Sequence, residues 1–186
     1  MMNFLKKIIF FFSLSIILLS INWTIAVAQD GEGSDVKIDY SDIPSSCFGT
    51  GKWKIEHGRY GIKFSCSNVD SLEYKNAMNR DYRGAFIDIR LNGVNHYDSL
   101  ADFASDHGAK VVTETNFKGY TAFLADNSSA EFLEHSYKYY WFRVGSTPVL
   151  IRMSCGGFYT EQMNDCWQEI NRALPHIKIT SKSGTN

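Results

Sequence analysis

Four cysteines constrain the fold of this 186-residue chain more than any other feature of its sequence. They stand at Cys47, Cys66, Cys155 and Cys166, and four cysteines can pair in three ways. We favour Cys47–Cys66 with Cys155–Cys166, because the members of each pair are close in sequence and local structure closes such loops easily. No C-x-x-C or H-x-x-x-H spacing is present, so the pattern favours structural disulfides over a zinc site.

The N-terminal residues 1–28 have the pattern of a secretory signal peptide. Lys6 and Lys7 precede an apolar run over residues 8–21, and Ala26 and Ala28 form an A-x-A cleavage site. We expect cleavage after Ala28, a periplasmic or secreted location, and oxidising conditions in which the cysteines pair. A retained membrane anchor is the alternative, since residues 8–28 are about long enough to cross a bilayer.

The remaining chain of about 158 residues has the size of one domain. Residues 29–46 are acidic and rich in Gly and Ser, which predicts a flexible segment, and residues 181–186 form a polar tail. We expect a single domain over residues 47–180. Loss of two lysines with the leader takes the formal net charge from −1 to −3. Such a chain lacks the concentrated basic surface that nucleic acid or an anionic membrane requires, and we expect no membrane span after cleavage.

Alternation of apolar and polar residues predicts the strands. Residues 53–66 alternate on both sides of a turn, which predicts a hairpin with one buried face. A third strand over residues 85–91 ends at an Asn-Gly turn signal. The remaining predicted strands cover residues 110–115, 120–125, 132–144 and 149–155.

Two amphipathic helices complete the predicted elements. The first has its inward-facing residues at i, i+3, i+4 and i+7 from Leu100 and ends at Gly108. The second is expected over residues 161–174 with Thr160 as N-cap and Cys166 on its inward side. The expected fold class is therefore α+β, an antiparallel sheet packed with two helices and held by two disulfides.

Three segments resemble the core of the PsbP-like α/β/α sandwich domains. They are SLADFASDHGAKVVTETNFKGYTAF, SYKYYWFRVGSTPVLIRMSC and TEQMNDCWQEINRALPHIKI. In that family a short amphipathic helix leads into a strand, a G-x-x-φ strand (here residues 119–122), an aromatic hairpin and a closing helix. The resemblance covers about residues 50–180 and implies helices on both faces of the sheet. Family members include photosystem subunits, small secreted or lipid-anchored proteins, and periplasmic immunity proteins that neutralise toxins delivered by bacterial secretion systems.

The predicted aromatic hairpin over residues 132–155 has two different faces. If Val144 faces Val149, one face is apolar core, and the other holds Tyr137, Tyr139, Trp141, Arg143, Leu150 and Arg152. Tyr, Trp and Arg are enriched at the hot spots of protein interfaces. The candidate partner-binding residues are therefore Tyr139, Trp141, Arg143 and Arg152. The alternative is that a helix covers this face and the arginine stems pack over its rings. In that case the binding surface is expected in the loops around residues 92–96 and 126–129.

No pattern of residues typical of catalysis stands out. None of the five histidines has a second His, Asp or Glu at ligand or relay spacing. Asp88 and Glu114 on neighbouring predicted strands can in principle flank a cleft, as in glycosidases, but Asp88 beside Arg90 is the ordinary pattern of an ion pair. We expect no catalytic residue, no metal and no cofactor.

The sequence favours an exported, non-enzymatic protein that binds another protein. The resemblance implies, more narrowly, a periplasmic immunity protein that inhibits a toxin or effector. One alternative is a secreted effector or small hydrolase whose site is assembled from Asp88, Glu114 and His135. Another is an envelope-associated accessory protein.

Overall fold

The computed structural model describes residues 35–68, 83–91, 94–109, 111–128, 136–157 and 159–182. The predicted signal peptide, residues 1–28, lies outside the described residues, as do residues 29–34 and 183–186. The longer strands are β4 (Lys54–Gly58), β5 (Gly61–Ser67), β6 (Arg83–Arg90), β7 (Val111–Phe117), β8 (Tyr120–Asp126), β9 (Ser136–Val144) and β10 (Thr147–Gly157). The short strands are β1 (Val36–Asp39), β2 (Ser46–Cys47), β3 (Gly51–Lys52) and β11 (Lys178–Ser181). The helices are α3 (Leu100–His107), α4 (Thr160–Ala173) and the 3-10 turn η1 (Leu174–His176).

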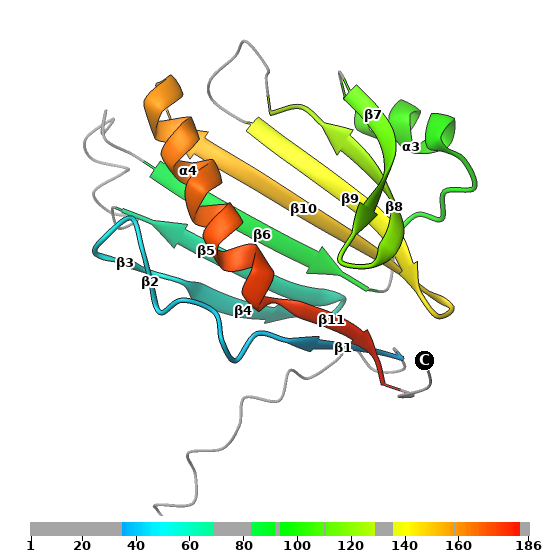
Figure 1. Cartoon of the computed structure of the whole chain (residues 1–186), viewed down its shortest axis with the longest axis horizontal. Helices are drawn as coiled ribbons and strands as arrows, with labels where there is room; N and C mark the ends of the chain where they lie inside the picture. Colours follow the sequence, from blue (N-terminus) through cyan, green and yellow to red (C-terminus); the bar gives the residue numbers. More distant parts are fainter. Residues whose placement is uncertain are drawn as a thin grey trace, which may run out of the picture.

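The longer strands form one antiparallel sheet in the order β4-β5-β6-β10-β9-β8-β7. Helix α4 crosses this sheet over β6 and β10, whereas α3 lies at the end formed by β7 and β8 (Figure 1). Two ribbons, β1 with β11 and β2 with β3, complete the described structure.

The predicted α+β class is wrong, because the described residues are mostly antiparallel sheet. Strands account for 54% of them and helices for 20%. The sequence analysis did not detect β1, β2, β3 and β11, whose two to four residues are too few to show alternation. The predicted α/β/α sandwich is corrected for the same reason, since one seven-stranded sheet dominates the structure.

The hydrophobic core lies between the sheet and α4. Every second side chain of the central strands is buried there, as the burial pattern of β10 shows. The largest of these residues are Ile62, Phe64, Ile87, Ile89, Phe142, Val149 and Ile151, and α4 adds Met163, Cys166, Ile170 and Ala173. Full burial of one such Ile or Phe contributes about 1.5–3 kcal/mol, so this side of the sheet, the α4 face, supplies most of the stability.

Both predicted disulfides are confirmed. Cys155–Cys166 joins β10 to α4 over 11 residues, with 5.7 Å between the Cα atoms. Cys47–Cys66 joins β2 to β5 over 19 residues, with 6.5 Å between the Cα atoms. The Cys166 sulfur also lies 3.1 Å from the Gly84 carbonyl oxygen, a close contact rather than a hydrogen bond because a disulfide sulfur carries no hydrogen. One bond therefore fixes α4 to the sheet, and the other fixes β2 to the same side of the sheet.

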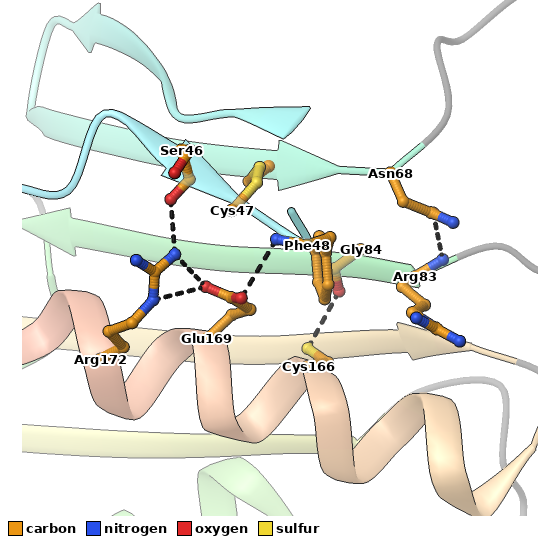
Figure 2. Close-up of a disulfide and its surroundings, with 10 residues drawn as sticks. Ser46, Cys47, Phe48, Asn68, Arg83, Gly84, Cys166, Glu169 and Arg172 are labelled. Atoms are coloured by element: carbon orange, nitrogen blue, oxygen red, sulfur yellow. Dashed lines mark hydrogen bonds and ion pairs between the residues drawn. A yellow bond between two sulfur atoms is a disulfide. The ribbon is translucent and has the colours of Figure 1, made fainter. Parts of the chain in front are cut away.

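Helix α4 also holds the turn between β2 and β3 (Figure 2). Glu169 accepts a hydrogen bond from the Phe48 N–H at 3.1 Å and pairs with Arg172 at 2.6 Å. Arg172 in turn donates to the Ser46 carbonyl at 2.5 Å. Phe48 has φ 47, a conformation that is costly for a bulky residue, so these contacts compensate for backbone strain in the turn.

The core begins before the boundary predicted at Cys47. Val36 and Ile38 are 0% and 2% exposed, because β1 pairs with β11 beside the C-terminal end of α4 (Figure 1). Tyr40 packs edge-on against Phe64 with 5.4 Å between the ring centroids. The alternating residues Val36, Ile38 and Tyr40 were not interpreted as a strand because the segment around them is mostly acidic and polar.

The β9–β10 hairpin has the predicted faces but a tighter turn. Val144 pairs with Thr147, so Gly145 and Ser146 alone make the turn, with Gly145 at φ 59. The predicted pairing of Val144 with Val149 is wrong by two residues, since Val149 pairs with Phe142. Because side chains alternate with a period of two, this shift leaves both faces unchanged.

Removing the bond between β10 and α4 should lower the free energy of unfolding by about 3 kcal/mol, the chain-entropy cost for a loop of this length. The variant combines Cys155→Ala with Cys166→Ala and is compared with the oxidised wild type by urea denaturation. Reduced wild type is an unsuitable control, because reduction also opens Cys47–Cys66. A loss below about 1 kcal/mol contradicts the structural role given to this bond.

Candidate functional site

The side of the sheet opposite α4 is covered only in part. Helix α3 packs over β7 and β8, and no other described helix or strand packs on this side of β4, β5, β6 and β10. We call this surface the open face. Its side chains are Lys54, Glu56, Lys63, Ser65, Phe86, Asp88, Arg90, Tyr137, Tyr139, Leu150, Arg152 and Ser154.

Charged side chains of alternating sign form a row across the open face. The strand register places Glu56 opposite Lys63, Lys63 opposite Asp88, and Asp88 opposite Arg152. Tyr139 on β9 ends the row beside Arg152. Directly opposite residues have Cβ atoms about 4.5–5.5 Å apart, so each charge lies next to one of opposite sign.

Most charges of the row already have a partner. Lys63 lies 3.7 Å from Glu56 on β4. Arg90 lies 2.8 Å from Asp88, which confirms the ion pair predicted for these two residues. Arg152 makes no ion pair with any residue in the described ranges, and its guanidinium lies 5.9 Å from the centroid of the Tyr139 ring. Arg152 is exposed, so its N–H groups are available to a ligand.

A cavity of about 240 Å³ lies where the open face meets α3. We call it the α3 hollow, and its polar and aromatic walls include Arg90, Tyr97, Asp106, His107, Tyr139 and Arg152. A second, wider cavity of about 350 Å³ lies at the tip of the β4–β5 hairpin and shares Asp88 and Arg90 with the first. The two cavities therefore adjoin along the open face.

Asp106 forms the α3 side of the hollow and is held by two donors. The Tyr97 hydroxyl and the Asn95 amide, at 3.1 Å, both donate to its Oδ2 atom. These two bonds hold the pKa of Asp106 below its ordinary value. Burial, together with the hydrogen bond to Asp106, raises the pKa of Tyr97 to about 12. The loop before α3 is thereby fixed to the helix.

Trp141 is buried, so the prediction that it faces a partner is wrong. It is 6% exposed, and its Nε1 donates to the Asn95 carbonyl at 3.2 Å. Its ring stacks on Phe123 at 5.5 Å and meets Tyr97 edge-on at 5.6 Å. Phe103 of α3, fully buried, belongs to the same cluster. A helix covers this end of the sheet, as the alternative interpretation supposed.

Arg143 lies at the hairpin tip, away from the hollow. It donates to His96 Nδ1 at 2.9 Å and to the Ser146 carbonyl at 2.7 Å. Because arginine only donates, His96 carries its proton on Nε2, which lies 2.6 Å from Asp98. Arg143 is exposed, but its donors are engaged within the chain.

Tyr139 and Arg152 are the two candidates that the structure brings together. They are opposite each other in the register, and both line the α3 hollow. Tyr139 is half-buried with its ring 4.5 Å from that of His107. His107 itself bonds the Phe103 carbonyl at 3.0 Å through Nδ1. One wall of the hollow is therefore aromatic and the other carries a free guanidinium.

The carboxylates proposed for a hydrolase lie far apart. Strands β10, β9 and β8 lie between β6, which carries Asp88, and β7, which carries Glu114. Four strand spacings of about 4.8 Å separate these backbones by roughly 19 Å. Paired glycosidase carboxylates are about 5–9.5 Å apart. The prediction of neighbouring strands was wrong because the sheet order does not follow the sequence, and His135 lies outside the described residues.

Sequence reasoning missed Tyr97 and Asp106, although Asn95 lies in the loop expected to bind a partner if a helix covered the hairpin face. The polar and aromatic loop before α3 was visible, but nothing in the sequence linked it to Asp106 on the helix. Among the described residues, no group of three or more His, Cys, Asp or Glu is placed to hold a metal ion. No helix of the described part is long and apolar enough to cross a membrane.

Trp141→Ala should lower the free energy of unfolding by about 3–5 kcal/mol, the usual cost of removing a buried large aromatic. Arg152→Ala should cost less than about 1 kcal/mol, because only the contact of its exposed guanidinium with the Tyr139 ring is lost. Urea denaturation of both variants measures this difference. Similar losses for the two variants would mean that α3 does not cover Trp141.

Tyr97 should remain protonated at pH 11, where a free tyrosine with a pKa near 10 is mostly ionised. A raised pKa stabilises the fold below pH 10, and this contribution is lost as the pH rises towards 12. Asp106→Asn should lower the pKa of Tyr97 but leave it above 10, since burial remains. Tyrosine-labelled NMR titration reads both values, and an unchanged pKa of Tyr97 in the variant would show that Asp106 has no part in the shift.

No protein-family model matches this chain, and no curated protein matches it. The resemblance to PsbP-like domains therefore stays a prediction. The function is argued below from the open face and the α3 hollow.

Proposed function

We propose that this chain is an exported protein that binds another protein through its open face. The observation that carries the proposal is the exposed Arg152, which has no ion pair among the described residues and lies next to the half-buried side chains Tyr139, Leu150 and Phe86. Aromatic residues and Arg are enriched in protein interfaces, where flat rings bury area at small entropic cost.

The open face alone is smaller than a standard protein interface. Four strands about 4.8 Å apart and about six residues long cover roughly 400 Å², whereas a stable interface buries about 800 Å² on each partner. A partner seated on the open face must therefore also contact its rims. These are the tip of the β4–β5 hairpin and the loop before α3, and each already borders one of the two cavities.

The narrower role that we propose is inhibition of a toxin or effector, as by a periplasmic immunity protein. Such a protein acts by covering a surface of its target and needs no catalytic group of its own. A preformed sheet face binds with little loss of conformational entropy. The two disulfides suit an oxidising compartment, which agrees with the proposed export.

Photo-cross-linking in the source cells tests the binding surface. The full chain with p-benzoyl-phenylalanine in place of Phe86, on the open face, should capture one protein. The same group in place of Lys37, exposed on β1 on the α4 side of the sheet, is the matched control and should not capture it. Capture of the same protein from both positions, or none from Phe86, would contradict the proposal.

The captured protein then tests the inhibitory role. Expressed alone in the bacterial periplasm it should slow growth, and co-expression of this chain should restore growth. Arg152→Glu should abolish this protection, whereas Lys37→Glu should retain it. A partner that is harmless when expressed alone would exclude the role of an immunity protein and leave the binding function intact.

A further inference from the structure

Arg152 is the cation of the row that makes no ion pair with a described residue. Asp88 lies directly opposite it, but Oδ2 of Asp88 accepts a hydrogen bond from Arg90 Nε at 2.9 Å and lies 2.8 Å from Arg90 Nη2 in an ion pair. The described residues offer Arg152 only the ring of Tyr139. A guanidinium over a ring keeps its N–H edge free, and that edge matches the two oxygens of a carboxylate.

The open face carries the charge that an acidic ligand requires. Its four cations are Lys54, Lys63, Arg90 and Arg152, and its two carboxylates are Glu56 and Asp88, which gives a net charge of +2. The whole chain has a formal net charge of −1, so this surface is positive against the balance of the molecule. Complementary charge favours a partner with acidic groups over this face.

The remaining acidic group of the hollow, Asp106, is already engaged. Its Oδ2 atom accepts from Tyr97 and Asn95, and these donors partly offset its charge. His107 and Tyr139 form an aromatic wall, with 4.5 Å between their ring centroids. The hollow thus offers one free cation and apolar ring surfaces.

We infer that the α3 hollow receives a glutamate or aspartate side chain of the partner protein. Its carboxylate pairs with Arg152, and its methylene groups pack on Tyr139 and His107. A cavity of about 240 Å³ accommodates a single side chain. Charge-assisted bidentate pairs are among the stronger polar contacts between proteins. The inference rests on the proposed function and adds the chemistry that the partner must present.

NMR titration of the full, oxidised chain tests the inference without the partner. The probe is a blocked pentapeptide of glutamates. It should shift the Arg152 Nε–Hε signal and the Tyr139 ring signals in a saturable way. A glutamine pentapeptide, and acetate at the same carboxylate concentration, should leave these signals unchanged.

Two variants that each remove one cation separate a specific site from general charge. Arg152→Gln should weaken binding of the glutamate peptide at least about tenfold, as expected for losing one charge-assisted contact. Lys37→Gln is the control, because Lys37 is an exposed cation on β1, on the α4 side of the sheet and away from both cavities, and makes no ion pair with a described residue. It should bind as the wild type does. Equal thermal midpoints establish that both variants are folded.

An equal response to the glutamine peptide or to acetate, or unchanged binding by Arg152→Gln, would overturn the inference. If the open face cross-links to a partner while the glutamate peptide shifts nothing, the inference fails and the proposed function stands. If the peptide binds through Arg152 while Phe86 captures no protein, the carboxylate site stands and the proposed function fails.

Discussion

The packing of α4 across β6 and β10 is the contact on which the rest of the structure depends. It buries alternate side chains of the central strands, and the Cys155–Cys166 bond fixes the helix to the sheet. Glu169 and Arg172 of the same helix form hydrogen bonds to the β2–β3 ribbon and its turn (Figure 2). Because one side of the sheet is filled in this way, the residues that alternate with the core point to the other side. The open face is thus a direct consequence of the packing of α4.

Local patterns in the sequence predicted the elements that carry a strong period. The disulfide pairing followed from short separations, and the faces of the β9–β10 hairpin followed from alternation even though the register was shifted by two residues. The class was wrong because strands make up 54% of the described residues and helices only 20%. Strands β1 and β11 were missed because each has only four residues and pairs only with the other. Residues far apart in sequence supply that signal, and no local pattern contains it.

Only the part of the candidate site that lies within one hairpin could be predicted from local patterns in the sequence. Arg152 and Tyr139 belong to one hairpin, so their shared face could be read from the sequence. Their surroundings come from β6, α3 and the loop before α3, and sheet order decides that these meet. Trp141 has the same alternation as Tyr139, yet α3 covers one and leaves the other at the rim of the hollow. Which of two equivalent positions a helix covers depends on tertiary packing.

The two sides of the sheet bear on how this protein can evolve. Residues that stabilise the fold lie on the α4 face, and the charged row lies on the other side of the same strands. Substitutions in the row therefore change the charges presented to a partner with little effect on the core. Surface substitutions of this kind usually alter stability by less than about 0.5 kcal/mol. A lineage can accordingly exchange Lys63, Asp88 or Arg152 one at a time, and so follow a changing target while the scaffold stays folded.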